Sequence, residues 1–287
     1  MISVADWERG GVRVELLGHR VFCREGGDER APVLVLLHGF PTSSWDFEAL
    51  WEPLTARFRV VTLDLLGFGL SAKPAQRYTI ALQADLVEAR LRQLGVGAYH
   101  VLAHDYGDTV AQELLARASD APRLQSVCFL NGGLFPETHH PLLIQRLLLS
   151  PVGTLVARLT SRARFEASLR RIFGPKTPPT PEALDGFWSL VTRDGGIPVM
   201  ARLIHYMRER VVHRERWVGA LQRTTVPLAL IDGAADPISG RHMAERYRAL
   251  VPSPRVALLE GIGHYPQVEA PAMVLDAFLE FHEALAR

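Results

Sequence analysis

The chain has 287 residues, which is enough for one large hydrophobic core or for a core with an added subdomain. Hydrophobic residues make up 48% of the chain and charged residues 22%, the composition of an ordinary globular protein. The formal net charge of +1 gives no long-range field toward a polyanion. We therefore expect neither a nucleic-acid partner nor a general attraction to an anionic membrane surface.

The N-terminus and the two cysteines bear on the cellular location. Residues 1–10 contain Asp6 and Glu8 and no continuous apolar stretch, so they do not form a signal peptide. Cys128 lies in an apolar run that is typical of a buried strand, and we expect it and Cys23 to be small buried residues rather than a disulfide. The expected location is the cytoplasm.

The first half of the chain alternates short β-rich runs with helical patterns. Apolar residues recur at helical spacing over 79–94, and the pattern ends at Gly95, a frequent C-terminal signal. Continuous apolar runs indicate strands that are covered on both faces. The predicted strands of this half are 12–16, 20–24, 33–37, 60–63, 99–103 and 127–130. This β-α-β order predicts a mostly parallel sheet with helices on both faces.

The pattern changes between residues 132 and 220. Helical stretches broken by prolines follow one another there, without a strong strand signal. Buried-strand patterns return at 228–231 and 256–259, before a final helix at 271–286. The sequence therefore predicts an α/β core formed by residues 1–131 and 221–287, interrupted by a helical cap at residues 132–220.

The segment 141–159 is rich in leucine and has about the length of a membrane span. Arg146, Pro151 and Arg158 interrupt it, and each charge would be costly in hydrocarbon. We expect a helix or helix pair that covers an apolar cavity, and we consider membrane association unfavoured.

The central motif is Ala103-His104-Asp105-Tyr106-Gly107, which directly follows a predicted buried strand. A nucleophile flanked by small residues at a strand-to-helix turn is known as a nucleophile elbow, because larger neighbours would clash in the strained turn. The following helix N-terminus favours a negative charge at this position. On the motif alone, Asp105 could also be an ordinary helix N-cap, where aspartate is common.

Three further segments complete the catalytic pattern. The motif His-Gly-Phe-Pro after strand 33–37 matches the loop that supplies an oxyanion-hole amide in α/β-hydrolases, so Phe40 and Tyr106 N–H are the expected donors. His264, in a Gly-His-Tyr-Pro motif, stands where the base is expected, and Asp236 follows an earlier strand as the acid that orients it. The order nucleophile, acid, base is the order of α/β-hydrolases.

On these motifs, the whole chain resembles the epoxide hydrolase and haloalkane dehalogenase branch of the α/β-hydrolases. More narrowly, Asn131–His139 (NGGLFPETH), Arg216–Leu221 (RWVGAL) and the elbow are similar to the mesoderm-specific transcript protein family. The resemblance implies an α/β-hydrolase fold, with a mostly parallel eight-stranded sheet, helices on both faces and a helical cap insertion.

An aspartate nucleophile selects the kind of carbon that is attacked. The carboxylate is ionised at neutral pH, because its unperturbed pKa is about 3.9. Attack on an ester carbonyl would give an anhydride, whereas attack on a saturated carbon gives an ordinary alkyl-enzyme ester. His264, oriented by Asp236, would then activate a water molecule against the Asp105 ester. Esterase chemistry is therefore disfavoured.

The leaving group separates the remaining reactions. A departing halide needs N–H donors, typically from a tryptophan after the nucleophile, and this chain has Tyr106 and Phe40 in the corresponding places. A fluoroacetate-type enzyme would have an arginine beside the nucleophile, where this chain has Tyr106 and Asp108. An epoxide opens to an alkoxide, which needs a proton donor from the cap.

Epoxide hydrolases usually supply that proton from two cap tyrosines, and the predicted cap of this chain contains only Tyr206. Tyr206 would act alone or together with His139 or His140, although Tyr206 could also be a packing residue and His139 a surface residue. The candidate substrate-binding residues are Trp45, His139, His140 and His205. The arginines at 162–171 and 208–216 are interpreted as solvated faces of the cap, or alternatively as a means of steering an anionic substrate.

We predict a hydrolase that opens small apolar epoxides to diols through an alkyl-aspartyl ester, with no cofactor. No metal-ligand cluster or phosphate-binding glycine loop is present in the sequence. Asp105 is the expected nucleophile, His264 the base, Asp236 the orienting acid and Tyr206 the ring-opening acid. The alternatives are a haloalkane dehalogenase and a hydrolase-fold binding or signalling protein with weak turnover. Sequence spacing does not define the oligomeric state.

Overall fold

The computed structural model describes residues 1–117 and 123–285. Within them, one eight-stranded sheet has the order β1-β2-β4-β3-β5-β6-β7-β8. The pairs β1–β2 and β2–β4 are antiparallel and all other neighbours are parallel, which confirms the predicted mostly parallel sheet. The strands are β1 (Gly11–Leu16), β2 (His19–Gly26), β3 (Val33–Leu37), β4 (Arg59–Leu63), β5 (Ala98–His104), β6 (Arg123–Leu130), β7 (Leu228–Gly233) and β8 (Arg255–Leu259).

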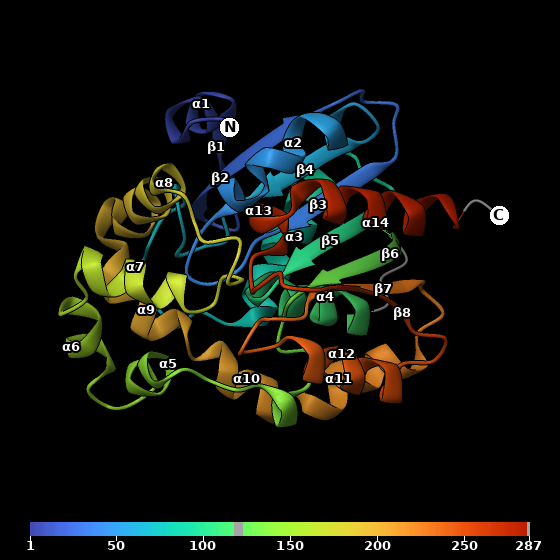
Figure 1. Cartoon of the computed structure of the whole chain (residues 1–287). Helices are drawn as coiled ribbons and strands as arrows, with labels where there is room; N and C mark the ends of the chain where they lie inside the picture. Colours follow the sequence, from blue (N-terminus) through green and yellow to red (C-terminus); the bar gives the residue numbers. More distant parts are fainter. Residues whose placement is uncertain (118–122, 286–287) are drawn as a thin grey trace.

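Helices cover both faces of the sheet (Figure 1). One face is covered by α2 and α14, which pack on each other and on strands β4 and β7. The other face is covered by α3, α4 and α12. The helices of the core are α1 (Val4–Arg9), α2 (Glu48–Thr55), α3 (Ile80–Gln93), α4 (Tyr106–Arg117), α12 (Arg241–Leu250), α13 (Pro266–Glu269) and α14 (Pro271–Glu283). The predicted end of the last helix, residue 286, lies outside the described residues.

Local features of the sequence explain the bounds and the burial of several core elements. Helix α3 begins after Thr79, whose side chain accepts a hydrogen bond from Leu82 N–H, and it is followed by Gly95 with a φ of 68°. The apolar runs of β3 and β5 are buried in the core, as continuous hydrophobic strands require. Cys23 and Cys128 are both free and buried, which confirms their assignment as small core residues.

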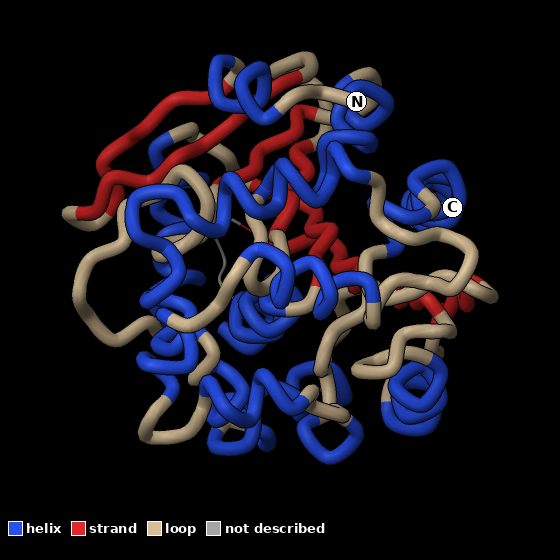
Figure 2. Tube along the Cα trace, turned by 60° about the vertical axis from the view of Figure 1, so that its left-hand side comes forward, coloured by secondary structure: helices blue, strands red, loops and turns tan. Residues whose placement is uncertain are grey.

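The segment between β6 and β7 is helical throughout its described elements. Its α-helices are α5 (Leu143–Leu148), α6 (Gly153–Arg158), α7 (Arg162–Arg170), α8 (Pro181–Thr192), α9 (Gly196–Leu203), α10 (Tyr206–Val212) and α11 (Arg214–Arg223). Helices α5 to α9 form a layer to one side of the sheet, which comes to the front in Figure 2. We call residues 132–220 the cap.

The predicted end of the cap at residue 220 falls inside α11, which packs against α4 of the core. The chain therefore returns to the core through a helix rather than through a loop. None of the described helices is both long enough and apolar enough to cross a membrane.

Candidate active site

The elbow is formed where β5 ends and α4 begins. Asp105, between them, has a φ of 45°, a left-handed conformation that non-glycine residues seldom adopt and that differs from the extended backbone of an ordinary N-cap. A Cβ atom on Gly107 would lie 2.3 Å from the carbonyl oxygen of Leu37, so only glycine fits two positions after Asp105. The strained turn predicted from the small residues is therefore present.

The carboxylate of Asp105 has different surroundings at its two oxygens. Phe40 N–H donates to Oδ2 over 3.1 Å. The Tyr206 hydroxyl lies 3.3 Å from Oδ1 and 3.4 Å from Oδ2. Tyr106 is the first residue of α4, where an amide N–H has no acceptor within the helix. The core thus presents two amides near Asp105, and the cap presents a phenol.

Arg210 of α10 also contacts the nucleophile. Its Nη2 atom lies 2.8 Å from the backbone oxygen of Asp105 and 3.4 Å from Oδ1, and its Nε donates to Thr109 Oγ1 over 2.7 Å. The guanidinium carbon stands 4.5 Å from the centre of the Tyr206 ring. Arg210 is 2% exposed, so its assignment to a solvated face of the cap was wrong.

A sequence signal for Arg210 was available. Tyr206 and Arg210 are four residues apart on one helix, so they share a face, and the face that brings Tyr206 to Asp105 brings Arg210 as well. The basic residues on either side concealed this position, because a run of arginines usually marks a solvated surface.

Burial and charge act in opposite directions on the Asp105 carboxyl. Burial disfavours the ionised form, but Arg210, His264, His104 and the Phe40 amide outweigh it and lower the pKa of Asp105 below its usual value. Asp105 is therefore a carboxylate at neutral pH although it is buried. An ionised nucleophile needs no base to activate it.

His264 and Asp236 form a hydrogen-bonded pair at the ends of β8 and β7. His264 Nδ1 donates to Asp236 Oδ2 over 2.8 Å. Burial opposes the ionisation of Asp236, but His264 and the donors around the carboxylate outweigh it and lower its pKa to about 2. Its other donors are Ile238 N–H (2.8 Å), Ser239 N–H (3.1 Å), Ser239 Oγ (2.8 Å) and Asn131 Nδ2 (3.1 Å).

The imidazole of His264 is buried beside two carboxylates. Burial alone would lower its pKa, but Asp236 and then Asp105 outweigh burial and raise it above 6.5. His38 and His104 both form hydrogen bonds with backbone groups. His104 Nε2 donates to the carbonyl oxygen of His264 over 2.7 Å, and His38 Nε2 accepts from Leu65 N–H over 3.0 Å.

Asp105 and His264 line the same cavity, which has a volume of about 400 Å³. This size suits a small organic molecule. Much of the remaining wall comes from the cap, and it is mainly apolar. The cap residues are Leu142, Ile144, Gln145, Leu147, Leu148, Val156, Leu159, Thr160, Arg164, Phe165, Ser168, Leu169, Ile172 and Met200. Helices α5 and α6 thus cover an apolar cavity, as predicted for residues 141–159.

None of the four predicted substrate-binding residues, Trp45, His139, His140 and His205, is among the residues that line this cavity, so the structure does not bring them to the site. Trp45 is buried against Phe187 and donates to the backbone of Ile2. His140 is exposed and stacks on His242, with ring centres 4.3 Å apart. The contacts of Trp45 and His140 are thus made with residues outside the cavity wall.

His139 and His205 line other hollows of the cap. His139 lines a separate hollow of about 420 Å³ together with Arg210, and burial lowers the pKa of this imidazole to about 3. His205 lines a hollow of about 770 Å³ with Arg77 and Arg202. Neither imidazole reaches the wall around Asp105. Sequence spacing could not define which side of a cap loop faces the core.

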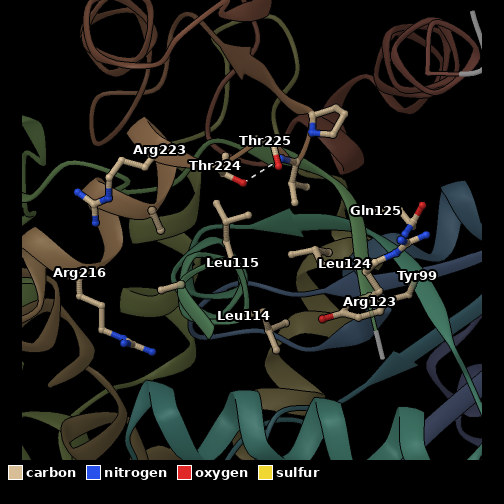
Figure 3. Close-up of a pocket in the computed structure, with 14 residues that line it drawn as sticks. Tyr99, Leu114, Leu115, Arg123, Leu124, Gln125, Arg216, Arg223, Thr224 and Thr225 are labelled. Atoms are coloured by element: carbon tan, nitrogen blue, oxygen red, sulfur yellow. Dashed lines mark hydrogen bonds between the residues drawn. The ribbon is translucent and has the colours of Figure 1, made fainter. Parts of the chain in front are cut away.

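A larger hollow of about 970 Å³ lies at the amino ends of β5 and β6, opposite the catalytic edge (Figure 3). It is lined by Tyr99, Leu115, Arg216, Thr224 and other residues, among which the described chain places no histidine, cysteine or carboxylate. This hollow therefore lacks a nucleophile and base pair. The described residues also contain no group of three or more His, Cys, Asp or Glu side chains arranged to hold a metal ion.

Comparisons with known proteins agree with this fold. The α/β hydrolase fold family model matches residues 32–271. The mesoderm-specific transcript protein of Mus musculus is 43% identical over 97% of this chain and 88% of its own length. A Mycobacterium tuberculosis protein, LipZ, whose name assigns it provisionally as a hydrolase, is 40% identical over 96% of this chain and 97% of its own.

Solved structures share the architecture. Haloalkane dehalogenase DbeA from Bradyrhizobium elkani superposes with a TM-score of 0.81 over 96% of this chain and 98% of that chain, at 21% identity, a likeness that concerns the fold alone. A membrane phospholipase A structure superposes with a TM-score of 0.75, at 25% identity, over 99% of this chain and 90% of that chain. The chain belongs to the α/β-hydrolase fold family and, within it, to the family of the mesoderm-specific transcript proteins.

Proposed function

We propose that this α/β-hydrolase opens epoxides to vicinal diols through a covalent ester on Asp105. One observation carries the proposal: the ionised carboxylate in the wall of an apolar cavity has the Tyr206 hydroxyl 3.3 Å from Oδ1, the oxygen that would attack, although the buried Tyr206 side chain is not itself among the residues that line the cavity. An apolar epoxide needs this combination, because its carbon must be attacked while its oxygen receives a proton. No cofactor enters this chemistry.

In the first step, Asp105 Oδ1 attacks an epoxide carbon, a C–O bond of the three-membered ring breaks, and the ring oxygen becomes an alkoxide. Tyr206 donates its hydroxyl proton to that oxygen. Burial and the Asp105 charge raise the pKa of Tyr206 well above 10, so the proton remains on the phenol until the more basic alkoxide forms. The products of this step are an alkyl ester, a hydroxyl group and a Tyr206 phenolate.

Arg210 has a defined role in this step. Its guanidinium lies over the Tyr206 ring and would stabilise the phenolate by charge. The chain has one cap tyrosine where epoxide hydrolases usually have two, and we propose that Arg210 compensates by stabilising the conjugate base of the single donor. Since Arg210 Nη2 and Nε are held by the backbone of Asp105 and by Thr109, we do not assign Arg210 to substrate-carboxylate binding.

In the second step, His264 removes a proton from water, whose oxygen attacks the ester carbonyl carbon of Asp105. The negative charge develops on Oδ2, which accepts from Phe40 N–H, and Tyr106 N–H is the proposed second donor. The ester C–O bond then breaks and the departing alkoxide takes the proton from His264. Asp105 is left as a carboxylic acid, and its proton returns to the Tyr206 phenolate. The net reaction therefore adds one water molecule to the epoxide to give the diol, and both side chains recover their starting forms.

Formation of the ester prepares His264 for this step. The carboxylate charge of Asp105 contributes to the raised pKa of His264 in the free enzyme. Esterification removes that charge, so the pKa of the imidazole falls and its neutral form becomes more populated. The base is thus released at the point in the cycle at which it is needed.

The decisive experiment is mass spectrometry of a His264→Gln variant incubated with styrene oxide. Glutamine cannot activate water, so the variant should accumulate one added epoxide mass, and peptide mapping should place it on Asp105. A variant that also carries Asp105→Asn should gain no mass. His242→Gln, a histidine outside the cavity, is the matched control and should turn over without accumulating an adduct.

Three outcomes would reject the proposal. An adduct on another residue would remove Asp105 from the nucleophile role. Absence of any adduct, combined with halide release from bromoalkanes by the unmodified protein, would assign the site to dehalogenation instead. Absence of turnover with either class of substrate would favour a binding or signalling role.

A further inference from the structure

The cap carries a cluster of exposed apolar side chains on α5, α6 and their connections, and we call it the leucine face. Leu143 is 72% exposed and Leu155 is 58% exposed. The full set is Leu143, Leu147, Val152, Leu155 and Leu159. Helices α5 and α6 lie side by side and pack against each other (Figure 1). The exposed side chains that they and their connections carry therefore belong to one region of the surface. A gathering of this kind usually marks an interaction surface.

The same region is strongly basic. Residues 141–176 contain seven basic side chains and one acidic side chain, Glu166, in a chain with a net charge of only +1. Arg162 is neutralised by ion pairs with Glu166 and Asp185. Within the described residues, the exposed side chains of Arg146, Arg158, Arg170 and Arg171 make no ion pair. The balanced total charge of the chain thus conceals a local cationic surface.

The leucine face also holds the mouth of the catalytic cavity. Leu147, Leu159 and Arg164 are exposed, and all three line the cavity that contains Asp105 and His264. A molecule that enters the cavity past these side chains therefore crosses the leucine face.

We infer that the leucine face docks on an anionic lipid surface. Its leucine and valine side chains would enter the boundary between headgroups and acyl chains, and its unpaired arginines would meet the lipid phosphates. Arginines were an obstacle to a membrane-spanning segment, but in a docked helix they lie at the headgroup level, where their charge remains solvated. The net charge of +1 gives the whole chain no general attraction to an anionic membrane surface, but the unpaired arginines of this face provide a local attraction.

The cavity mouth favours lipid over a protein partner as the occupant. A protein or a second copy of this chain that covered the face would also cover the entrance beside Leu147 and Leu159. A fluid lipid surface leaves that entrance open to molecules dissolved among its acyl chains. The docking itself does not depend on the proposed reaction. Only the further step, in which an apolar epoxide passes from the lipid into the cavity, rests on the proposed function.

The test is co-sedimentation with lipid vesicles. The intact protein should bind vesicles of phosphatidylcholine and phosphatidylserine at least tenfold more tightly than vesicles of phosphatidylcholine alone, and added salt should weaken the binding. The combined change Leu143→Glu and Leu155→Glu, which leaves the cavity wall intact, should reduce binding at least tenfold. The matched control is Val12→Glu with Met273→Glu, two exposed apolar residues of the core, and it should bind as the intact protein does.

Charge is tested separately from apolar contact. Arg158→Gln with Arg170→Gln should abolish the preference for anionic vesicles, whereas Arg248→Gln, an exposed arginine of α12, should retain it. The inference is overturned if no vesicle binds, if both lipid compositions bind equally, or if the core variants lose binding as the leucine variants do. A leucine-dependent dimer in light scattering, without vesicle binding, would also overturn it. These readouts require no turnover, so failure of the epoxide reaction leaves the docking test independent.

Discussion

The two sides of Asp105 are built differently. On the core side, Phe40 N–H, Asp236 and His264 come from loops at strand ends, and the hydrogen bonds among these groups and their neighbours measure 2.8–3.1 Å. On the cap side, Tyr206 and Arg210 reach the carboxylate oxygens with long side chains from α10, at 3.3–3.4 Å. The core side is fixed by backbone geometry, whereas the cap side depends on how the helical layer lies over the sheet.

This contrast separates two functions within one site. The core side provides what any hydrolase with this nucleophile needs, namely an oriented base and amides for a developing oxyanion. The cap side provides what depends on the leaving group, namely a proton donor and a charge that stabilises its conjugate base. We therefore expect changes on the core side to affect every substrate and changes on the cap side to affect epoxides most.

The largest effect is expected for Asp105→Asn. The amide keeps the volume of the side chain and tolerates a positive φ, but it is not a nucleophile. Epoxide turnover should fall by at least about 10⁴-fold, as it does when a group that forms the covalent intermediate is removed. The measurement is kcat for diol formation, with intact mass confirming that the amide has not hydrolysed.

A buried carboxylate outside the cavity provides the control for Asp105→Asn. Asp232 of β7 is buried, and burial raises its pKa well above the usual value, so Asp232→Asn should retain most of the activity. If Asp105→Asn remained active while its mass was unchanged, Asp105 would not be the nucleophile, and the role given to the core side of the site would be rejected. Thermal unfolding of both variants shows whether either loss reflects folding.

The same contrast explains what the sequence could predict. Asp105, Asp236 and His264 each follow a buried apolar run, and the carboxyl ends of parallel strands meet at one edge of the sheet. Spacing along the chain therefore placed all three together, and the structure has them at the predicted strand ends. The eight predicted strands also match, although β6 begins earlier than predicted because Arg123–Gln125 at its start are not fully buried.

The cap does not follow such a rule. Helices α5 to α10 are short and separated by prolines and bends, so a residue number does not define which side of the cap a side chain occupies. The chemistry of His139, His140 and His205 makes them candidates, but none of the three is among the residues that line the catalytic cavity. Arg210 was overlooked among surface arginines. Its spacing of four residues from Tyr206 is the sequence signal, and the contacts of Arg210 with Thr109 and Asp105 show that this face of α10 is the buried one.

The cap side is tested by Tyr206→Phe. This change removes the proton donor and leaves Asp105 in place, so epoxide opening should fall by about 10²-fold, a typical contribution of a general acid. Alkylation of Asp105 by a bromoalkane needs no proton and should change much less. The measurement is the rate of adduct formation with each reagent in a His264→Gln background.

Tyr247→Phe provides the matched control for this variant. Tyr247 is another fully buried tyrosine, on α12 and outside the cavity. Removal of its hydroxyl should therefore leave the rate of adduct formation unchanged with both reagents. An equal loss with both reagents in Tyr206→Phe would assign Tyr206 to positioning Asp105 rather than to proton donation. It would also remove the distinction between the two sides of the site.

The smallest effect is expected for Arg210→Met, and it should be visible mainly in acid. Arg210 helps to lower the pKa of Asp105, and the carboxylate attacks only above that pKa. Removal of the guanidinium charge therefore raises the pKa of Asp105, and the acid limb of the alkylation rate should move to higher pH. At pH 7 the carboxylate remains ionised, so alkylation by a bromoalkane should change less than about tenfold.

The effect is measured as the rate of Asp105 alkylation against pH in the His264→Gln background, with Arg208→Met as control. Arg208 lies on the same helix but is exposed, and it bonds the backbone of Leu149 rather than Asp105. An unchanged acid limb in Arg210→Met would show that the arginine does not govern ionisation of the nucleophile. The contact of Arg210 with the Tyr206 ring would then be the remaining basis for a functional role. In that case Arg210→Met should slow the reaction with epoxides and not the reaction with bromoalkanes, because only epoxide opening needs the phenol to give up its proton.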